Sequence, residues 1–238
     1  NRRSRGLGDV YKRQDKVLLA RNLILGFLAL LVLGFVATTF YFGAGLSQNT
    51  VPEEGTDFEM IEGVKPTQPA RSLLVEEYFS YGCIHCKNFD PELEAWLTGL
   101  PADVKFARKP TAFSRAWSVL AQAYYALEKA EALEGNHEQL FKGIHNGGRT
   151  FNSGQDIADY LDSPTLPAEE FMRAFNSREV TRRLNRATED TRRAGIRAVP
   201  TLVVAGKYRV GMTHGGRRAL EVVEYLLERE RSLLGKPL

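Results

Sequence analysis

Two cysteines stand close together in the chain. Cys83 and Cys86 form the motif C-I-H-C, and His85 lies between them. Thiols with this spacing at the start of a helix can close a small disulfide ring and so exchange two electrons. At such a position Cys83 meets unpaired backbone N–H groups and the positive end of the helix dipole, which favour a thiolate. The motif therefore predicts a redox-active pair with Cys83 as nucleophile, and His85 adds a nearby donor.

The same motif is also found in metal sites, so binding of a metal ion is the alternative to redox chemistry. A structural zinc site normally has four ligands, and no second cysteine pair exists in the chain. The other histidines, His137, His145 and His214, fall in separate predicted elements without ligand-like spacing. We therefore predict no metal ligand and give these histidines ordinary surface or core roles. A C-x-x-C metal-binding module stays the less favoured alternative. A purely structural disulfide is disfavoured because so short a loop removes little entropy from the unfolded chain.

The residues around the pair predict how it is positioned. Residues 72–80 (SLLVEEYFS) are rich in β-branched and aromatic side chains, which is typical of a strand. Apolar residues at helical spacing come next over 83–97, so the cysteines lie at a strand-to-helix junction. Alternation along the strand places Glu76 and Glu77 on opposite faces, and one of them should point inward.

The rest of the chain predicts an α/β architecture. A strand is expected at 104–107, and strands return at 201–205 and 208–210, separated by Gly206-Lys207. Helical patterns lie between them and after them, at 116–133, 137–144, 155–161, 168–175, 178–194 and 216–234. This order predicts an α/β sandwich with an inserted helical subdomain at about 112–194.

The N-terminal part predicts one transmembrane helix. Residues 23–42 contain no charge and are long enough to cross a hydrocarbon core of about 30 Å. Basic residues precede this run and acidic residues come after it, which favours a C-terminal part outside the cytoplasm. Residues 15–45 are thus a membrane anchor, or a signal segment if they are cleaved. We interpret residues 1–14 as non-native, because residues 9–14 back-translate into a sequencing adapter.

Composition limits the size of the part beyond this segment. The chain has 238 residues, 43% of them hydrophobic, which allows one sizeable domain, preceded by a spacer at 46–71 with a possible first strand near 58–61. The formal charge of +3 comes in good part from the first sixteen residues, so it does not predict a nucleic-acid partner.

Two separated stretches carry a family resemblance. The segments VEEYFSYGCIHC and IRAVPTLVVAGKYRV resemble the DsbA family of periplasmic thiol:disulfide interchange proteins. The similarity covers about residues 57–238 and includes VKFARKPTAF and AWSVLAQAYYAL. It implies a thioredoxin-like fold with an inserted helical subdomain.

The resemblance also implies roles for single residues. Cys83 matches the exposed nucleophilic sulfur, Cys86 the buried partner, and Val199-Pro200 a loop that faces the disulfide with a cis proline. A proline there leaves no backbone N–H unpaired against a sulfur. Glu77 matches a buried acid, whose pKa should rise by desolvation and which can relay the proton of Cys86.

Residues 84 and 85 bear on the redox potential. Ile84 replaces the proline that the family commonly carries between the cysteines, whereas His85 is retained. We include Ile84 with Val199 and Pro200 in the substrate-binding set. The departure at Ile84 makes the redox potential the property that most needs measurement.

The predicted function is the introduction of disulfide bonds into extracytoplasmic proteins. The expected partners are reduced or unfolded protein substrates and, by the resemblance, a DsbB-like membrane quinone reductase; no bound cofactor is required. The expected location is the periplasmic face of the bacterial inner membrane, or the periplasm after cleavage. A disulfide reductase or isomerase on the same fold is the alternative, and Val199 favours an oxidase because isomerase relatives often carry Thr there.

Overall fold

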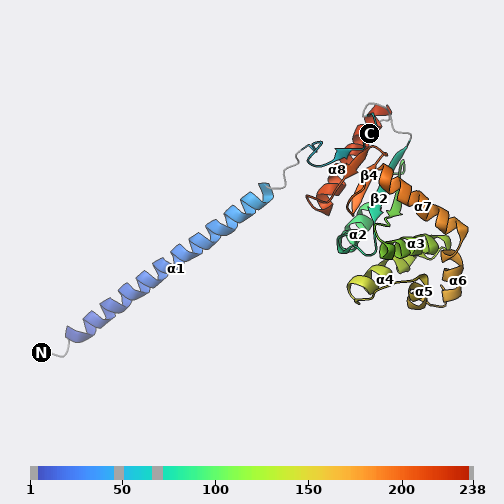
Figure 1. Ribbon diagram of the computed structural model, residues 1–238. Helices are drawn as coiled ribbons and strands as arrows, with labels where there is room; N and C mark the ends of the chain where they lie inside the picture. The colour runs from blue at the N-terminus through green and yellow to red at the C-terminus, as the bar shows by residue number, and fades with distance from the viewer. Residues whose placement is uncertain (1–4, 46–50, 66–71, 236–238) are drawn as a thin grey trace. The chain divides into compact units, whose positions relative to one another are not determined.

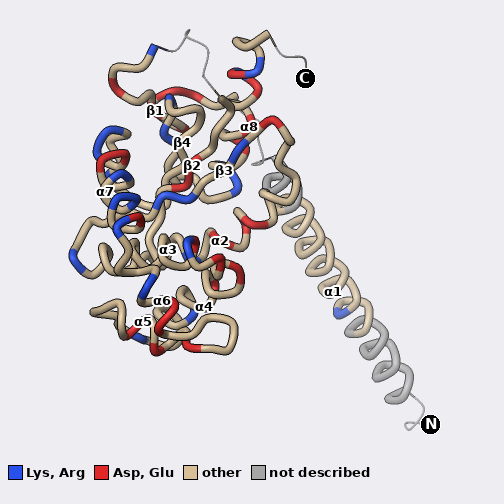
Figure 2. Tube along the Cα trace, turned by 90° about the vertical axis from the view of Figure 1, so that its right-hand side faces the viewer, with Lys and Arg blue, Asp and Glu red and all other residues tan. Residues whose placement is uncertain are grey.

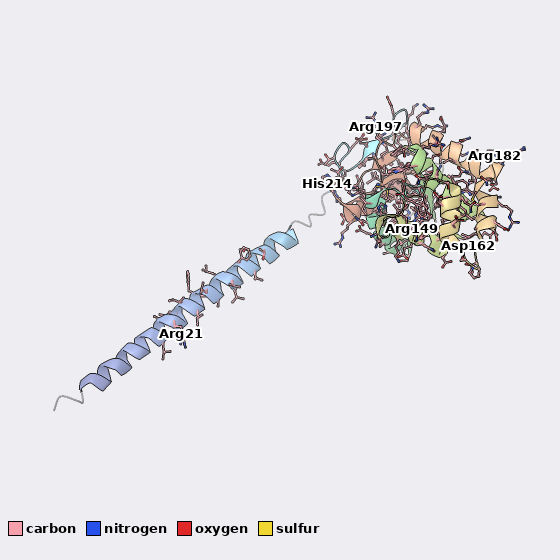
Figure 3. The ribbon with its side chains drawn as sticks, turned by 60° about the horizontal axis from the view of Figure 1, so that its bottom comes forward. Arg21, Arg149, Asp162, Arg182, Arg197 and His214 are labelled. Atoms are coloured by element: carbon pink, nitrogen blue, oxygen red, sulfur yellow. The ribbon has the colours of Figure 1, made fainter. Side chains whose placement is uncertain are left out.

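The computed structural model describes residues 5–45, 51–65 and 72–235, and the chain divides into two units at Val51. The first unit is the helix α1, Arg5–Gly45, which begins within residues 1–14. Its stretch Leu18–Thr39 has a mean hydropathy of 2.2 and suffices in length and composition to cross a membrane, a test that a signal sequence also passes. Arg21 is the charged residue of this stretch (Figures 2 and 3). The predicted N-terminal apolar helix is thus present.

The second unit is built on a mixed sheet of five strands in the order β1-β5-β4-β2-β3. The strands are β1 Glu59–Met60, β2 Leu73–Phe79, β3 Val104–Pro110, β4 Thr201–Val204 and β5 Tyr208–Val210. β2 runs parallel to β3 and antiparallel to β4, so it lies inside the sheet. All predicted strands are confirmed. The hairpin turn differs slightly: its two positive-φ residues are Ala205 and Gly206, whereas Gly206-Lys207 was expected.

Two helices cover one face of this sheet. α2 (Ile84–Leu97) and α8 (Gly216–Leu233) pack on the side chains of Leu73 and Val75 through residues such as Leu93 and Val223. Tyr78 points to the opposite face, where it meets Ala194 and Ile196. Because alternate residues of β2 share a face, Glu77 lies on the α2 side with Leu73 and Val75. This alternation brings the buried acid under the helix that carries the cysteines.

The helical insertion lies between β3 and β4. It comprises α3 Arg115–Lys129, α4 Leu133–His145, α5 Gly154–Leu161, α6 Ala168–Phe175 and α7 Arg178–Arg193. Figures 1 and 2 both place α3 to α6 beyond one end of the strands, and Arg182 of α7 reaches away from the domain in Figure 3. The insertion has its own core, which continues to Tyr81, Cys83 and Cys86. The helical subdomain therefore forms one wall of the region around the cysteines.

The described part of the predicted spacer is partly folded onto the domain. Phe58 is buried in the core shared with α8, and Asp57 pairs with Arg218 at 2.9 Å. The second unit, which begins at Pro52, thus includes part of the predicted spacer. Residues 46–50 and 66–71 of the spacer lie outside the described residues.

Candidate active site

Cys83 stands at the junction between β2 and α2. Its extended backbone (φ −100°, ψ 116°) makes it the N-cap of α2, and its N–H donates to the carbonyl of Ser80 at 3.0 Å. Cys86 lies one turn into the helix and has no exposed surface. Both are free thiols. Cys83 is the more accessible of the two, although its exposure is only 8%, less than expected for an exposed sulfur.

The two thiols have opposite acidities. The hydrogen bond from the Cys86 thiol lowers the pKa of Cys83 against the effect of burial, and the backbone N–H groups of Cys86 and His85 lower it further, to about 6. The charge of the exposed His85 acts in the same direction. Burial raises the pKa of Cys86 far above its ordinary value, and its hydrogen bond to Cys83 adds to this. At neutral pH the reduced pair therefore holds a thiolate on Cys83 and a proton on Cys86.

The loop at Val199-Pro200 faces Cys83. Sγ of Cys83 lies 3.4 Å from the carbonyl oxygen of Val199, to which the thiol donates when it is protonated, and the Val199-Pro200 peptide bond is cis, as the resemblance implied. A cavity of about 550 Å³ adjoins this loop and is lined in part by His85, Val199, Pro200 and Met212. Ile84, at the start of α2, is 44% exposed. The fold thus brings the predicted residues of α2 together with a loop that lies more than a hundred positions away in the sequence.

Glu77 is the inward-pointing member of the glutamate pair. It is 1% exposed, and its carboxylate accepts a hydrogen bond from Arg108 Nε at 3.0 Å. Burial raises the pKa of Glu77 to about 7, although the charge of Arg108 opposes the rise. The charge of Glu77 in turn raises the pKa of Cys86, so the two groups are close enough to interact. Glu76 faces the other side and pairs with Lys109 at 3.2 Å.

A buried polar network connects this acid to the loop before Cys83. Arg108 Nη2 donates to Asp90 at 3.0 Å, and Asp90 lies 3.2 Å from Nε2 of His137. The other ring nitrogen of His137 lies 2.8 Å from the hydroxyl of Tyr81. Burial alone would raise the pKa of Asp90, but its contacts with His137 and Arg108 hold it below the usual value. Sequence reasoning had not identified Arg108, Asp90 or Tyr81 as part of the site.

Gly82 also occupies a position that only a glycine fits. The indole of Trp117 lies against it, and a Cβ added to Gly82 would be 2.5 Å from Trp117 Nε1, closer than real contacts allow. The ring of Phe113 stacks on Trp117 at a centroid distance of 5.8 Å, and Phe113 is 46% exposed. The start of the helical insertion thus places the Trp117 ring against Gly82, next to Cys83 in the sequence, and the Phe113 ring against Trp117.

Among residues 5–45, 51–65 and 72–235, no group of three or more His, Cys, Asp or Glu side chains is placed to hold a metal ion. His137 and His145, for which ordinary surface or core roles were expected, hydrogen-bond to Tyr81, two positions before Cys83. Their spacing relative to the cysteines contained no signal for this contact.

A C-x-x-C pair at the start of a helix, beside a buried acid and opposite an X-Pro loop, defines a thiol-disulfide oxidoreductase with a thioredoxin-like fold. Comparison with known proteins agrees with this class. Residues 74–227 match the DSBA-like thioredoxin domain, and the chain belongs to this family. Among its relatives, the thiol:disulfide interchange protein DsbA of Pseudomonas aeruginosa is 33% identical over 180 residues, which cover 75% of this chain and 85% of that protein.

A second relative and a solved structure show a similar extent of similarity. DsbA of Azotobacter vinelandii is 34% identical over 176 residues, covering 73% of this chain and 82% of the relative. The crystal structure of Pseudomonas aeruginosa DsbA superposes with a TM-score of 0.72 at 31% identity, covering 78% of this chain and 97% of that one. The chain is therefore a protein-disulfide oxidoreductase with the DsbA fold, and its C-x-x-C pair is Cys83 and Cys86.

Proposed function

We propose that this protein oxidises the thiols of extracytoplasmic proteins, and that Sγ of Cys83 is the atom that forms the mixed disulfide with the substrate. The observation that most supports oxidation, rather than reduction, of the substrate is the difference in pKa between the two thiols. A thiol whose pKa is about 6 is a good leaving group, and a stabilised thiolate favours the reduced form of the pair. A pair that is more stable when reduced is an oxidant toward its substrates.

The reaction begins with the disulfide form of the pair. A substrate thiolate attacks Sγ of Cys83, the Cys83–Cys86 bond breaks, and its electron pair goes to Cys86. Because burial disfavours a thiolate on Cys86, that sulfur takes up a proton, for which Glu77 is the donor. A second substrate thiolate then attacks the substrate sulfur of the mixed disulfide, and Cys83 leaves as a thiolate. The substrate gains one disulfide, and the enzyme is left reduced.

The surface around Cys83 suits an extended, unfolded substrate. The carbonyl of Val199 and the cavity beside Pro200 can take a peptide backbone as an added strand. Within residues 51–65 and 72–235 the exposed large hydrophobic side chains are Val51, Ile84, Phe113 and Leu233. Ile84 lies beside Cys83 in the sequence, and Phe113 stacks on the Trp117 ring that rests on Gly82. Apolar segments of an unfolded chain would meet this surface, with Ile84 in the substrate-binding set.

The N-terminal unit supports a location outside the cytoplasm. We assign residues 15–45 to a membrane anchor or signal segment, residues 1–14 to non-native sequence and residues 57–238 to the catalytic domain. The domain then lies in the periplasm, held to the inner membrane if the segment is retained. There a DsbB-like membrane quinone reductase would reoxidise the pair, with the enzyme itself carrying no cofactor.

The same geometry would serve a reductase or isomerase if electrons were supplied to the cysteine pair. The direction of electron transfer between the pair and the substrate is therefore the property to measure. We would equilibrate the full chain, in detergent, with glutathione buffers and determine the fraction of reduced Cys83–Cys86. An oxidase should have a potential well above the roughly −270 mV of thioredoxin. A potential near or below that value would contradict the proposed direction, and failure to oxidise a reduced, unfolded protein would contradict the function.

A further inference from the structure

Tyr81 is held at both ends by one helix of the insertion. Its hydroxyl lies 2.8 Å from Nδ1 of His137, and its backbone carbonyl accepts from Nε2 of His145 at 2.8 Å. Both histidines belong to α4, and they lie 56 and 64 positions beyond Tyr81 in the sequence. A side-chain contact and a main-chain contact on the same residue leave it little freedom to rotate or shift.

The partners of His137 determine where its proton lies when the ring is neutral. Asp90 is paired with Arg108, and its pKa is held below the usual value, so its carboxylate can only accept. Nε2 of His137 must then carry the hydrogen and donate to Asp90 across 3.2 Å. This leaves Nδ1 as the acceptor for the hydroxyl of Tyr81, which burial keeps protonated by raising its pKa. In the hydrogen-bonded series Tyr81–His137–Asp90, each group thus has a defined role as donor or acceptor.

Tyr81 belongs to the turn that positions Cys83 at the start of α2. The turn runs from Ser80 to Cys83, and Cys83 N–H donates to Ser80 O at 3.0 Å. The thiolate of Cys83 is stabilised most by the hydrogen bond from the Cys86 thiol and further by the backbone N–H groups of Cys86 and His85, and all these donors belong to α2. Because hydrogen bonds weaken steeply with distance and angle, a small shift of the turn relative to α2 would weaken these donors. The position of Tyr81 is therefore linked to the stability of the thiolate.

We propose that His145 and His137 are positioning residues for the redox reaction: by fixing the carbonyl and the hydroxyl of Tyr81, they hold Cys83 in register with the N–H donors of α2. The helix α4 of the insertion thereby contributes to the reactivity of Cys83 through its contacts with Tyr81. This inference rests on the proposed role of Cys83 and concerns residues that the mechanism above does not use.

The test measures the acidity of Cys83 in the reduced full chain by the absorbance of its thiolate near 240 nm, with Cys83→Ser as the blank. His145→Ala removes the donor to Tyr81 O, and we expect it to raise the pKa of Cys83 by about 0.5 to 1. The thiolate fraction at pH 6 should then fall from about half to between about one quarter and one tenth. His145→Gln, whose side-chain amide can replace the donor, should restore most of the thiolate.

Tyr81→Phe removes only the hydroxyl contact and should shift the pKa of Cys83 in the same direction by a smaller amount. Glu138→Ala is the matched control, because Glu138 is an exposed residue of α4 that pairs with Lys142. It should leave the pKa of Cys83 unchanged. If His145→Ala does not fold, Tyr81→Phe and His145→Gln carry the comparison.

The proposal is overturned if folded His145→Ala and Tyr81→Phe both keep the parental pKa of Cys83. It is also overturned if His145→Gln, while folded, loses as much thiolate as His145→Ala, since a donor would then not be what matters. Failure of the proposed function is a separate result: the parental protein would then not oxidise a dithiol peptide, whatever the pKa of the variants.

Discussion

Replacing the Cys83 thiol with a hydroxyl should remove a pH dependence from the stability of the reduced protein. The pKa of Cys83 is lowered to about 6 in the folded chain, whereas that of an unfolded thiol is about 8.5. The folded state therefore loses its proton first. The thiolate contributes a stability that is fully present above pH about 8.5, partial at neutrality, and lost as the pH falls through about 6.

The size of the effect is set by these two pKa values. Linkage gives a contribution to the free energy of unfolding of less than about 0.1 kcal/mol at pH 5, about 1.4 kcal/mol at pH 7 and about 2.5 kcal/mol at pH 8. Cys86, whose pKa is raised, acts in the opposite direction, but only where its unfolded thiol ionises, near pH 8.5 and above. Glu77 is present in both proteins and largely cancels in their difference. The window from pH 5 to pH 8 therefore isolates Cys83.

The assay is urea unfolding of the parental protein and of Cys83→Ser, both as full chains in detergent with excess reductant, monitored by tryptophan fluorescence. The difference in the free energy of unfolding between the two should grow by about 2.5 kcal/mol between pH 5 and pH 8. Oxidised parental protein is the control, since it has no thiolate and should lack this slope. A difference that stays constant within about 0.5 kcal/mol, close to the error of urea extrapolation, would refute the assignment of the thiolate to Cys83.

The other predictions use the same site. The pKa of Glu77 is raised to about 7, so this group contributes stability that is fully present below its unfolded pKa and lost as the pH rises through about 7. Glu77→Gln in the oxidised protein should therefore abolish a decline of up to about 3 kcal/mol between pH 4.5 and pH 7, measured by urea unfolding. Iodoacetamide at pH 6 should modify Cys83 at least about tenfold faster than Cys86 in the reduced protein, by peptide mass spectrometry. The reverse order would contradict the roles given to the two thiols. Gly82→Ala should destabilise the fold by about 1 to 3 kcal/mol, because its Cβ would meet Trp117. Unchanged thermal unfolding would mean that the indole can move aside.

The features that sequence reasoning predicted well are local ones. The strand before Cys83, the helix after it and the spacing of the two cysteines all lie within about twenty-five consecutive residues. Periodicity identifies such elements because each residue's face depends only on its near neighbours. For the same reason one of Glu76 and Glu77 was expected inside, and the family resemblance indicated that it is Glu77. The predicted helix at 137–144 agrees with the regular part of α4, because Glu134 and Gly135 interrupt the start of this element with non-helical backbone.

Contacts that depend on the register of the sheet could not be predicted from such patterns. Arg108 lies directly opposite Glu77 in the parallel pairing of β2 with β3. A shift of that register by one residue would turn Arg108 away from the acid and bring a neighbour in its place. The facing position of Val199 was inferred from the family resemblance and not from spacing, because 116 residues separate it from Cys83.

Tyr81 shows what kind of reasoning would have found more. It lies just after a strand that is rich in aromatic residues, and an aromatic side chain at such a position is usually buried. A buried tyrosine hydroxyl nevertheless needs a hydrogen-bond partner, because leaving it unpaired costs on the order of 1 to 3 kcal/mol. With a tyrosine two positions before Cys83 expected to be buried, the sequence already required a hydrogen-bond partner for its hydroxyl. The chain has four histidines, and one of those assigned ordinary roles meets this requirement. Counting the partners that buried polar atoms need would thus have marked Tyr81 as a residue with a polar contact still to be found, even though it could not have named His137.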